Sequence, residues 1–377
     1  MNTRRLWIDG SWRTASQRHT LISPWDNSPV ATCELASERD MQDALEAASQ
    51  AFRPLRRVSR HTRSVLLASM ATGIAARREH FVSRIVEEVG KPRKLAEVEV
   101  ARAVLTFTTA AEEAKRFGGE IVPMDIEPSG RDFLPALALL VARGPVLAIT
   151  PFNFPLNLVA HKVAPALAVG APVVVKPAPQ GPGAAELLAE VFQEALQGLP
   201  EPVPPAALQV VSASNDVVAQ AIEDPRIATL SFTGSQAAGW SLRARAGRKH
   251  VVLELGGNAA VIVHGDADLG HAASRCAFGA FAYAGQVCIS VQRVFVERSA
   301  FAGFLDLLTD HTRRLGVGDP HDASTVVGPL IDAAAVERVR SWIAEAKMRG
   351  ARVVLGGEAA GEAGEAGEYR GNVLSPT

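Results

Sequence analysis

The sequence predicts an α/β protein with more than one domain, and three observations support this. Between Val146 and Gly257, short apolar runs alternate with helical segments, a pattern typical of a doubly wound parallel sheet. A second alternation of strands and helices begins at Ala259. The length of 377 residues corresponds to two or three domains at roughly 150 residues each.

The first part of the chain predicts a hairpin, a helical region and a second hairpin. Leu6–Trp12 alternates enough to form a short hairpin around Asp9-Gly10. Region 37–117 has helical periodicity, with a stop at Gly90-Lys91-Pro92. Region 119–141 is extended and interrupted by proline, so we expect a hairpin that projects from the body. Its segment FLPALALLVAR is apolar on both faces, and we expect a partner subunit to cover it.

The remaining elements follow the α/β pattern. The strands of the parallel sheet are expected in VLAIT, APVVVKP, ALQVVS, IATLSFTG and HVVLELGG, with helices at Ala184–Leu196 and Val217–Ile222. The second stretch predicts strands in AAVIVHG and SVQRVFVE, helices at Leu269–Ala284, Phe301–Leu315 and Ala333–Arg349, and then the segment ARVVLGG. The acidic, low-complexity tract from Glu358 to Gly371 is expected to be a mobile loop.

Composition excludes several classes of protein. The chain has 39 Lys and Arg and 40 Asp and Glu, so its net charge is −1. This near-neutral charge gives no overall electrostatic attraction to nucleic acid or anionic lipid. No apolar stretch reaches the ~18 uninterrupted residues of a membrane-spanning helix, and no signal-peptide core is present. Three cysteines provide no disulfide framework. We therefore expect a soluble, cytoplasmic protein that binds no metal, nucleic acid or membrane.

Two polar residues at strand ends are candidates for a site. Asn153 lies in Thr150-Pro151-Phe152-Asn153-Phe154-Pro155, a stiff turn that can aim a carboxamide into a pocket. The alternative is an asparagine that bonds the backbone of its own turn. Lys176 closes the strand VVVK and can reach a ribose hydroxyl or a phosphate, unless it is only an end-of-strand cation with a buried stem.

Two further segments complete the candidate chemistry. Thr233-Gly234-Ser235 opens a helix, where bare N–H groups can bind an anion or where Ser235 is simply a helix cap. Glu254 precedes two glycines, and Cys288 follows Ala-Gly-Gln. A cysteine in this position is a candidate nucleophile if its thiolate is stabilised and it is partly exposed, and otherwise a buried structural residue. Cys33 and Cys276 lie on apolar faces and are expected to be buried.

The order of these motifs resembles the aldehyde dehydrogenase superfamily. The similarity extends from LWIDGSW through ITPFNFPLNLVAHKVAPALAVGAPVVVKP, SFTGS and LELGGN to AGQVCISVQRV. It implies oxidation of an aldehyde to an acid with NAD or NADP as cofactor. Cys288 would attack the aldehyde to give a thiohemiacetal, with the oxyanion held by the Asn153 side chain and the Cys288 N–H. Glu254 would then activate the water that hydrolyses the thioester, whereas members that transfer the acyl group to coenzyme A often lack this carboxylate.

The resemblance also implies a set of cofactor-binding residues. Lys176 would bond the adenosine ribose, and Ser235 with the N–H groups around Gly234 would hold the pyrophosphate. NAD-preferring members often carry a glutamate where this chain has Pro179, so we expect NADP to be tolerated and even preferred, with Ser212 or Ser214 beside its 2′-phosphate. The complete implied set is Thr150, Pro151, Phe152, Lys176, Pro179, Gly234, Ser235, Gly239, Leu255 and Gly256.

By the same resemblance, the domains are a Rossmann-type dinucleotide-binding domain (1–118 and 142–255), an oligomerisation hairpin (119–141) and a catalytic domain (256–377). The catalytic domain is expected to be incomplete, because the family's later Glu-x-Phe-Gly-Pro motif and tail strand are absent from this sequence. The alternative function is therefore a catalytically incompetent fragment that binds dinucleotide or pairs with other subunits. The expected partners are a small hydroxylated or acidic aldehyde and, if the remaining part is present, further copies of the chain. A cofactor-independent thiol esterase would leave Lys176 and Gly234-Ser235 unexplained.

Overall fold

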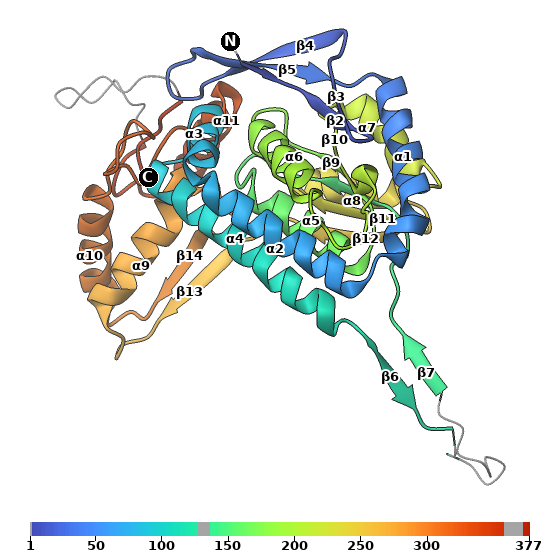
Figure 1. Cartoon of the computed structure of the whole chain (residues 1–377). Helices are drawn as coiled ribbons and strands as arrows, with labels where there is room; N and C mark the ends of the chain where they lie inside the picture. Colours follow the sequence, from blue (N-terminus) through green and yellow to red (C-terminus); the bar gives the residue numbers. More distant parts are fainter. Residues whose placement is uncertain (1, 125, 127–135, 358–371) are drawn as a thin grey trace.

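The structure is a computed structural model that describes residues 2–124, 126, 136–357 and 372–377. Its main element is a seven-stranded sheet with the strand order β12-β11-β8-β9-β10-β2-β3 (Figure 1). Five neighbouring strands run parallel: β8 (Val146–Ile149), β9 (Val173–Lys176), β10 (Leu208–Val210), β11 (Thr229–Thr233) and β12 (His250–Glu254). The chain moves from β8 outward in one direction and then returns to β11 on the other side of β8, which confirms the doubly wound α/β prediction.

The amino-terminal hairpin forms one edge of this sheet. Strands β2 (Leu6–Ile8) and β3 (Ser11–Arg13) are antiparallel, with Trp7 opposite Trp12, and β2 pairs with β10. The hairpin predicted around Asp9-Gly10 is thus confirmed. A separate three-stranded sheet contains β1 (Asn2–Arg4), β5 (Pro29–Leu35) and β4 (Gln17–Ile22).

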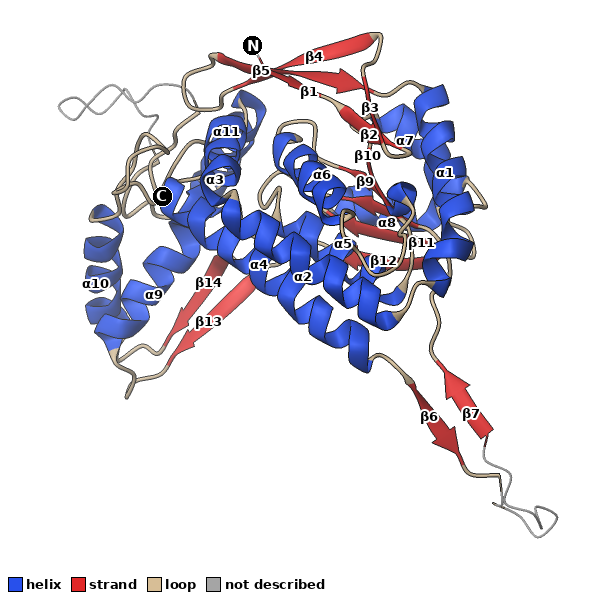
Figure 2. Ribbon diagram, viewed as in Figure 1, coloured by secondary structure: helices blue, strands red, loops and turns tan. Residues whose placement is uncertain are grey.

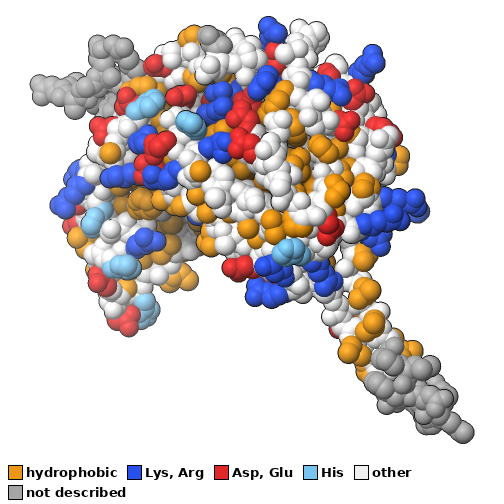
Figure 3. Space-filling model, in the orientation of Figure 1, with side chains coloured by type: hydrophobic (Ala, Val, Ile, Leu, Met, Phe, Trp, Pro, Cys, Tyr) orange, Lys and Arg blue, Asp and Glu red, His pale blue; other side chains and the backbone are white. Residues whose placement is uncertain are grey.

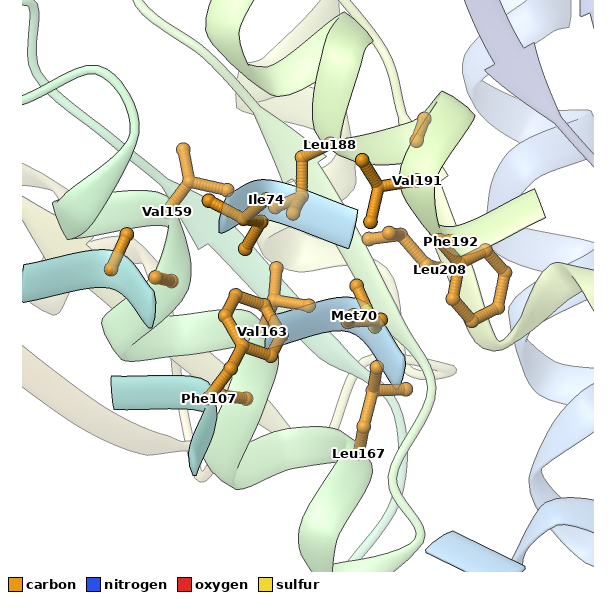
Figure 4. Close-up of a cluster of buried hydrophobic side chains, with 14 of the residues drawn as sticks. Met70, Ile74, Phe107, Val159, Val163, Leu167, Leu188, Val191, Phe192 and Leu208 are labelled. Carbon is orange, nitrogen blue, oxygen red and sulfur yellow. The ribbon is translucent and has the colours of Figure 1, made fainter. Parts of the chain in front are cut away.

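Helices cover both faces of the large sheet, and alternate residues of each strand point into different cores. Val173 and Val175 belong to one core and Val174 to the other, and all three are completely buried. The first core is formed against α2 (Arg60–Ala76), α3 (Arg78–Val89), α4 (Arg93–Arg116), α5 (Asn157–Val169) and α6 (Gly183–Ala195). The second is formed against α1 (Glu38–Arg57), α7 (Asn215–Glu223) and α8 (Gln236–Arg245). Figure 4 shows the first core, where Met70, Phe107, Val163 and Phe192 converge from four helices. A strand buried on both faces needs a continuous apolar run, which explains why VVV marks the middle of the sheet.

The stop at Gly90 has a steric cause. The helix α3 ends at Val89, and Gly90 adopts a left-handed φ of 62°. A Cβ at Gly90 would lie 2.6 Å from the Cγ of Pro329 and 2.8 Å from the Cγ of Pro24. Only glycine fits both the backbone conformation and the close approach of these two distant prolines.

The predicted projecting hairpin is confirmed. β6 (Gly119–Val122) pairs antiparallel with β7 (Ala136–Leu139) and extends away from the body (Figures 1 and 2). Its apolar residues Ile121, Leu137 and Leu139 are each about two-thirds exposed, and orange side chains line this arm in Figure 3. The first residues of the segment FLPALALLVAR lie outside the described residues.

A second, smaller α/β body follows. The strands β13 (Ala259–Val263) and β14 (Val291–Val296) pair in parallel and pack against α9 (Leu269–Phe281) and α10 (Phe301–Arg313), whereas α11 (Ala333–Met348) belongs to a separate apolar cluster. Segment 351–357 forms no strand. The acidic tract predicted as a loop, residues 358–371, lies outside the described part. None of the helices that the structure describes is long and apolar enough to cross a bilayer.

One predicted helix boundary was wrong. The helix expected over Leu269–Ala284 ends at Phe281 and is followed by a short 3₁₀ segment, Ala282–Gly285. Tyr283 and Ala284 both have positive φ, 54° and 53°. The conformation is strained for residues with a Cβ. It is held because the buried Tyr283 hydroxyl donates to the carbonyl of Val89 at 2.8 Å. This kink leads directly into the segment that carries Cys288.

Candidate active site

The carboxyl ends of the parallel strands bring four predicted residues to one edge of the sheet. Thr150 follows β8, Lys176 ends β9, Gly234 follows β11 and Glu254 ends β12. The Thr150 N–H donates to the carbonyl of Lys176 at 3.1 Å, and the Gly234 N–H donates to the carbonyl of Glu254 at 3.0 Å. In doubly wound sheets, ligands bind at this edge, at the position where the strand order reverses. Here that position lies between β8 and β11.

Two hydroxyl groups at this position are buried without a protein partner. They are the Oγ1 atoms of Thr150 and Thr233. Thr150 directly follows β8, and Thr233 is the last residue of the neighbouring strand β11. A buried hydroxyl without a hydrogen bond is unfavourable by about 1–3 kcal/mol, so these atoms fit a ligand that supplies donors or acceptors. Thr233 was not singled out from the sequence, although it lies inside the predicted phosphate-binding segment.

Lys176 also fits a polar ligand. Its side chain is 6% exposed, and it forms no ion pair with any residue that the structure describes. Burial lowers the pKa of Lys176 because the charged form is poorly solvated. An anionic or hydroxyl-bearing ligand would provide the missing partner.

The segment after β11 combines a helix cap with a close backbone approach. Ser235 is the N-cap of α8, and its hydroxyl accepts from the Ala238 N–H at 3.3 Å. A Cβ on Gly239 would lie 2.4 Å from Cδ2 of Leu255, and Gln236 Nε2 donates to the carbonyl of Gly256 at 3.3 Å. The Ser235 side chain therefore acts as a helix cap, while the exposed start of α8 remains open to an anion.

The region around Pro179 differs in part from the expectation. Pro179 is exposed, and its carbonyl lies 3.2 Å from His19 Nε2. Ser212 is buried near Cys33, whereas Ser214 is exposed and caps α7. Of the two serines predicted beside a 2′-phosphate, only Ser214 is accessible. The sequence offered no signal for His19, because it lies 160 residues from Pro179 along the chain.

Cys288 is exposed, whereas Cys33 and Cys276 are buried, as expected. The loop that follows Glu254 lies against the cysteine segment. A Cβ on Gly257 would be 2.7 Å from the carbonyl oxygen of Cys288, so a side chain at this position would displace one of the two segments. Gly257 thus lets the loop that follows the Glu254 strand and the cysteine-bearing turn come together.

Asn153 forms a hydrogen bond to the segment that carries Cys288. Its Nδ2 donates to the carbonyl of Gln286 at 2.9 Å, and its Oδ1 is buried without a partner. The asparagine therefore bonds a segment 133 residues away and not its own turn. One amide hydrogen of Asn153 remains for another acceptor.

Gln286 holds this turn in place and was not predicted as a site residue. Its Nε2 donates to the carbonyls of Tyr283 and Pro329 at 3.2 and 3.1 Å, and its Oε1 accepts from the Ile331 N–H at 2.9 Å. Its position two residues before a candidate cysteine was the one available signal in the sequence.

A second cation, Lys162, lies near Glu254. Lys162 is 6% exposed, and its Nζ donates to Ser231 Oγ at 2.9 Å. Burial lowers the pKa of Lys162 to about 8, although the negative charge of Glu254 opposes this shift. Glu254 itself is exposed to solvent, so water can reach its carboxylate. The sequence did not identify Lys162 as a site residue, because a single lysine in an apolar helix does not show that Ser231 and Glu254 lie near it in the fold.

A buried ion pair contacts the residues that directly follow Asn153. Lys91 Nζ lies 2.5 Å from Glu99 Oε2, and both residues are almost fully buried. Glu99 Oε1 accepts from the N–H groups of Leu156 and Asn157 at 2.9 and 3.0 Å. The Lys91 ammonium also lies 3.5 Å from the centre of the Phe154 ring. These contacts hold the residues after Asn153 in place and so position Asn153 for its contact with Gln286.

Comparisons with known proteins agree with this arrangement. The aldehyde dehydrogenase family model matches residues 12–377. The 3-sulfolactaldehyde dehydrogenase of Priestia aryabhattai is 39% identical over 354 residues, which cover 94% of this chain and 72% of the relative. Two solved structures superpose on the full length of this chain with a TM-score of 0.91. One is the NADP-dependent glyceraldehyde-3-phosphate dehydrogenase from Bacillus halodurans C-125, complexed with NADP, which is 32% identical and of which 76% is covered. The other is the NAD-dependent aldehyde dehydrogenase from Sinorhizobium meliloti, which is 33% identical and of which 73% is covered.

These structures share the overall fold of this chain, and the family model covers the segment that carries the exposed cysteine. The chain therefore belongs to the aldehyde dehydrogenase family.

Proposed function

We propose that this chain oxidises an aldehyde to a carboxylic acid with NAD or NADP. The observation that carries the proposal is the convergence of three segments: exposed Cys288, the loop after Glu254 that lies against it, and Asn153 bonded to Gln286 in the same turn. A soft nucleophile, a water-accessible carboxylate and an amide donor are the groups that thioester chemistry requires.

Cys288 begins the proposed reaction. Its thiolate adds to the aldehyde carbon, and the free N–H of Asn153 together with the Cys288 N–H binds the oxyanion of the thiohemiacetal. Each such donor contributes about 2.7–4 kcal/mol to transition-state stabilisation. The thiohemiacetal carbon would then lose a hydride, which NAD(P)⁺ would accept when bound, and a thioester on Cys288 would remain. Glu254 takes a proton from water as the water attacks this thioester, which releases the acid and restores the thiolate.

The cofactor would be held at the carboxyl edge of the sheet. Among the described residues at this edge, the Lys176 side chain and the hydroxyls of Thr150 and Thr233 lack protein partners. The N–H groups after Gly234 would face its phosphates. Pro179 in place of a carboxylate leaves the 2′ position without repulsion, so we propose that NADP is accepted and preferred.

The substrate is proposed to be a small aldehyde with an acidic or hydroxyl group. The names of two relatives support this: one acts on 3-sulfolactaldehyde and another on glyceraldehyde 3-phosphate. Both compounds carry an anionic group a few atoms from the aldehyde.

We also propose that copies of this chain associate through the arm formed by β6 and β7. Its apolar side chains Ile121, Leu137 and Leu139 are exposed in a single chain, and an edge strand with an apolar surface is a site for pairing with another chain.

A second candidate is a protein that binds dinucleotide without turnover. Apolar residues around the cysteine-bearing body are exposed, with Ile262 at 81% and Ile289 at 73%. Such a body can be too loose to hold the nucleophile in a reactive geometry.

The Glu254→Gln variant tests the proposed function. Because only the hydrolysis step needs the carboxylate, we expect one equivalent of reduced cofactor to form rapidly and steady-state turnover to fall by roughly 10²–10⁴-fold. The measurement is stopped-flow absorbance of NAD(P)H with a panel of aldehydes. Glu337→Gln, which removes an exposed carboxylate on α11, is the matched control.

Each result separates the two candidates. An unchanged steady-state rate in Glu254→Gln contradicts the role of Glu254. Cofactor binding by the native chain without any burst favours the binding protein over the dehydrogenase.

A further inference from the structure

The lysine of the helix stop after α3, Lys91, lies close to both segments that form the proposed site, although the reaction as proposed does not use it. Its ammonium lies 3.5 Å from the centre of the Phe154 ring and 5.0 Å from the centre of the Tyr283 ring. Phe154 directly follows Asn153, and Tyr283 lies in the kink that leads to Cys288. An ammonium within about 6 Å of an aromatic ring is attracted to it, most strongly where water is excluded. Lys91 therefore attracts a ring from each segment.

The partner of Lys91, Glu99, fixes the first of these segments through the backbone. Glu99 Oε2 lies 2.5 Å from Lys91 Nζ, and Glu99 Oε1 accepts from the N–H groups of Leu156 and Asn157 at 2.9 and 3.0 Å. Lys91 is 1% exposed and Glu99 is 0% exposed. A buried carboxylate without its cation is strongly unfavourable, so the position of Glu99 depends on Lys91. The ion pair thus orders the backbone three and four residues after Asn153.

The second segment is bonded to the same place in the chain. The buried Tyr283 hydroxyl donates at 2.8 Å to the carbonyl of Val89, two residues before Lys91. Burial and the negative charge of Glu99 raise the pKa of Tyr283, so the hydroxyl stays protonated and donates at neutral pH. Tyr283 and Ala284 have positive φ, a backbone conformation that persists only where surrounding contacts hold it. The bond to Val89 and the attraction of Lys91 for the ring are two such contacts.

Stability alone does not explain a charge pair at this position. Replacing a buried ion pair by apolar side chains of similar volume is often neutral or stabilising, because the two charges lose their hydration on burial. A buried polar network does, however, require one specific geometry of the groups around it, since each of its hydrogen bonds must be satisfied. Lys91 and Glu99 are too deeply buried to reach a substrate. They can therefore affect the reaction only through the groups that they orient.

We propose that Lys91 is a positioning residue, which holds the Asn153 turn and the segment that leads to Cys288 in a fixed position relative to each other. Its charge orients Glu99, which fixes the backbone after Asn153. Its attraction to the two aromatic rings holds the two segments against the same buried group. This inference rests on the proposed function, since it assumes that the amide of Asn153 and the sulfur of Cys288 act on one aldehyde.

The first test separates positioning from stability. Lys91→Met nearly keeps the side-chain volume but leaves Glu99 unpaired, so we expect both Tm and kcat to fall. In Lys91→Met/Glu99→Gln neither charge remains, so we expect Tm to return close to the native value. We expect kcat of this double variant to stay about 10- to 100-fold below that of the native chain, with KM for NAD(P) unchanged, because the attraction of the ammonium to the two rings is lost.

The matched control is Arg93→Met/Glu97→Gln, which removes a partly exposed ion pair from the helix that also carries Glu99. We expect kcat and Tm of this control to stay near the native values. Native kcat in Lys91→Met/Glu99→Gln overturns the proposal. A kcat that recovers together with Tm in this double variant also overturns it, because the lysine would then contribute only to stability.

The second test needs no turnover and uses hydrogen exchange followed by mass spectrometry. In Lys91→Met/Glu99→Gln we expect exchange to become several-fold faster in both 154–160 and 282–290, while α6 keeps its native protection. The control variant should match the native chain in all three regions. Faster exchange in only one of the two site segments, or an equal increase in α6, contradicts the shared positioning role. Faster exchange in both segments of a chain that forms no reduced cofactor would retain this role while the dehydrogenase proposal fails.

Discussion

The body on the seven-stranded sheet and the body on β13 and β14 are built from similar elements but are covered very differently. In β9, Val173, Val174 and Val175 are completely buried between two layers of helices (Figure 2). In the smaller body, Ile262 of β13 is 81% exposed and Phe295 of β14 is 55% exposed. The edge proposed to bind the cofactor therefore rests on a core closed on both faces, whereas the proposed nucleophile, Cys288, lies in the turn just before β14, next to a small sheet with exposed apolar residues.

The second body depends on specific contacts with the first. The Tyr283 hydroxyl donates to the carbonyl of Val89 at 2.8 Å, and Asn153 donates to Gln286 at 2.9 Å. Asn372 Nδ2 donates to the carbonyl of Pro24 at 3.1 Å. The difference shows that the position of Cys288 is determined mainly by such contacts between the bodies, since its own small core provides less rigidity.

The largest expected effect tests this difference in stability. Phe192 and Phe304 are both buried, at 0% and 2% exposure, one in each body. A Phe→Ala substitution in a core is destabilising by about 3–5 kcal/mol. For Phe192→Ala we expect faster hydrogen exchange in both bodies, because the second body depends on the first.

For Phe304→Ala we expect faster hydrogen exchange only in α9, α10 and their strands, with α6 still protected. Hydrogen exchange followed by mass spectrometry measures both variants, and each serves as the control for the other. Equal loss of protection in α6 in the two variants would mean that the bodies unfold as one unit.

The next effect tests the contact that joins the two bodies at the site. We expect Asn153→Ala to lower kcat by about 10²–10³-fold, because an oxyanion donor is removed. The alkylation rate of Cys288 by iodoacetamide, which develops no oxyanion at this position, should change little. If the alkylation rate falls as strongly as kcat, Asn153 acts by holding the Gln286 turn and not as an oxyanion donor.

The smallest effect concerns the first body alone. In Pro179→Glu we expect KM for NADP to rise about tenfold, which corresponds to about 1.4 kcal/mol of repulsion at an exposed position. KM for NAD should change less, and Pro179→Gln is the uncharged control. Steady-state kinetics with both cofactors provide the comparison. A native chain with strong NAD selectivity would contradict the proposed NADP preference.

Much of the first body could be predicted from local patterns. The run VVVK indicated a buried strand with a polar end, and Gly90-Lys91-Pro92 indicated a helix stop, since both signals depend on neighbouring residues. The kink at Tyr283 and Ala284 could not be predicted in this way. Its left-handed backbone is maintained by a hydrogen bond to Val89, 194 residues away in the chain.

For the site, the sequence by itself determined which groups are available and that the ends of parallel strands place Lys176, Gly234 and Glu254 at one edge. Only the tertiary structure decided that Asn153 bonds Gln286, that Gly257 lies against Cys288, and that Lys91 lies close to the rings of Phe154 and Tyr283. The physical reason is that strand order and side-chain alternation follow from short-range periodicity, whereas these contacts depend on how separate layers pack together.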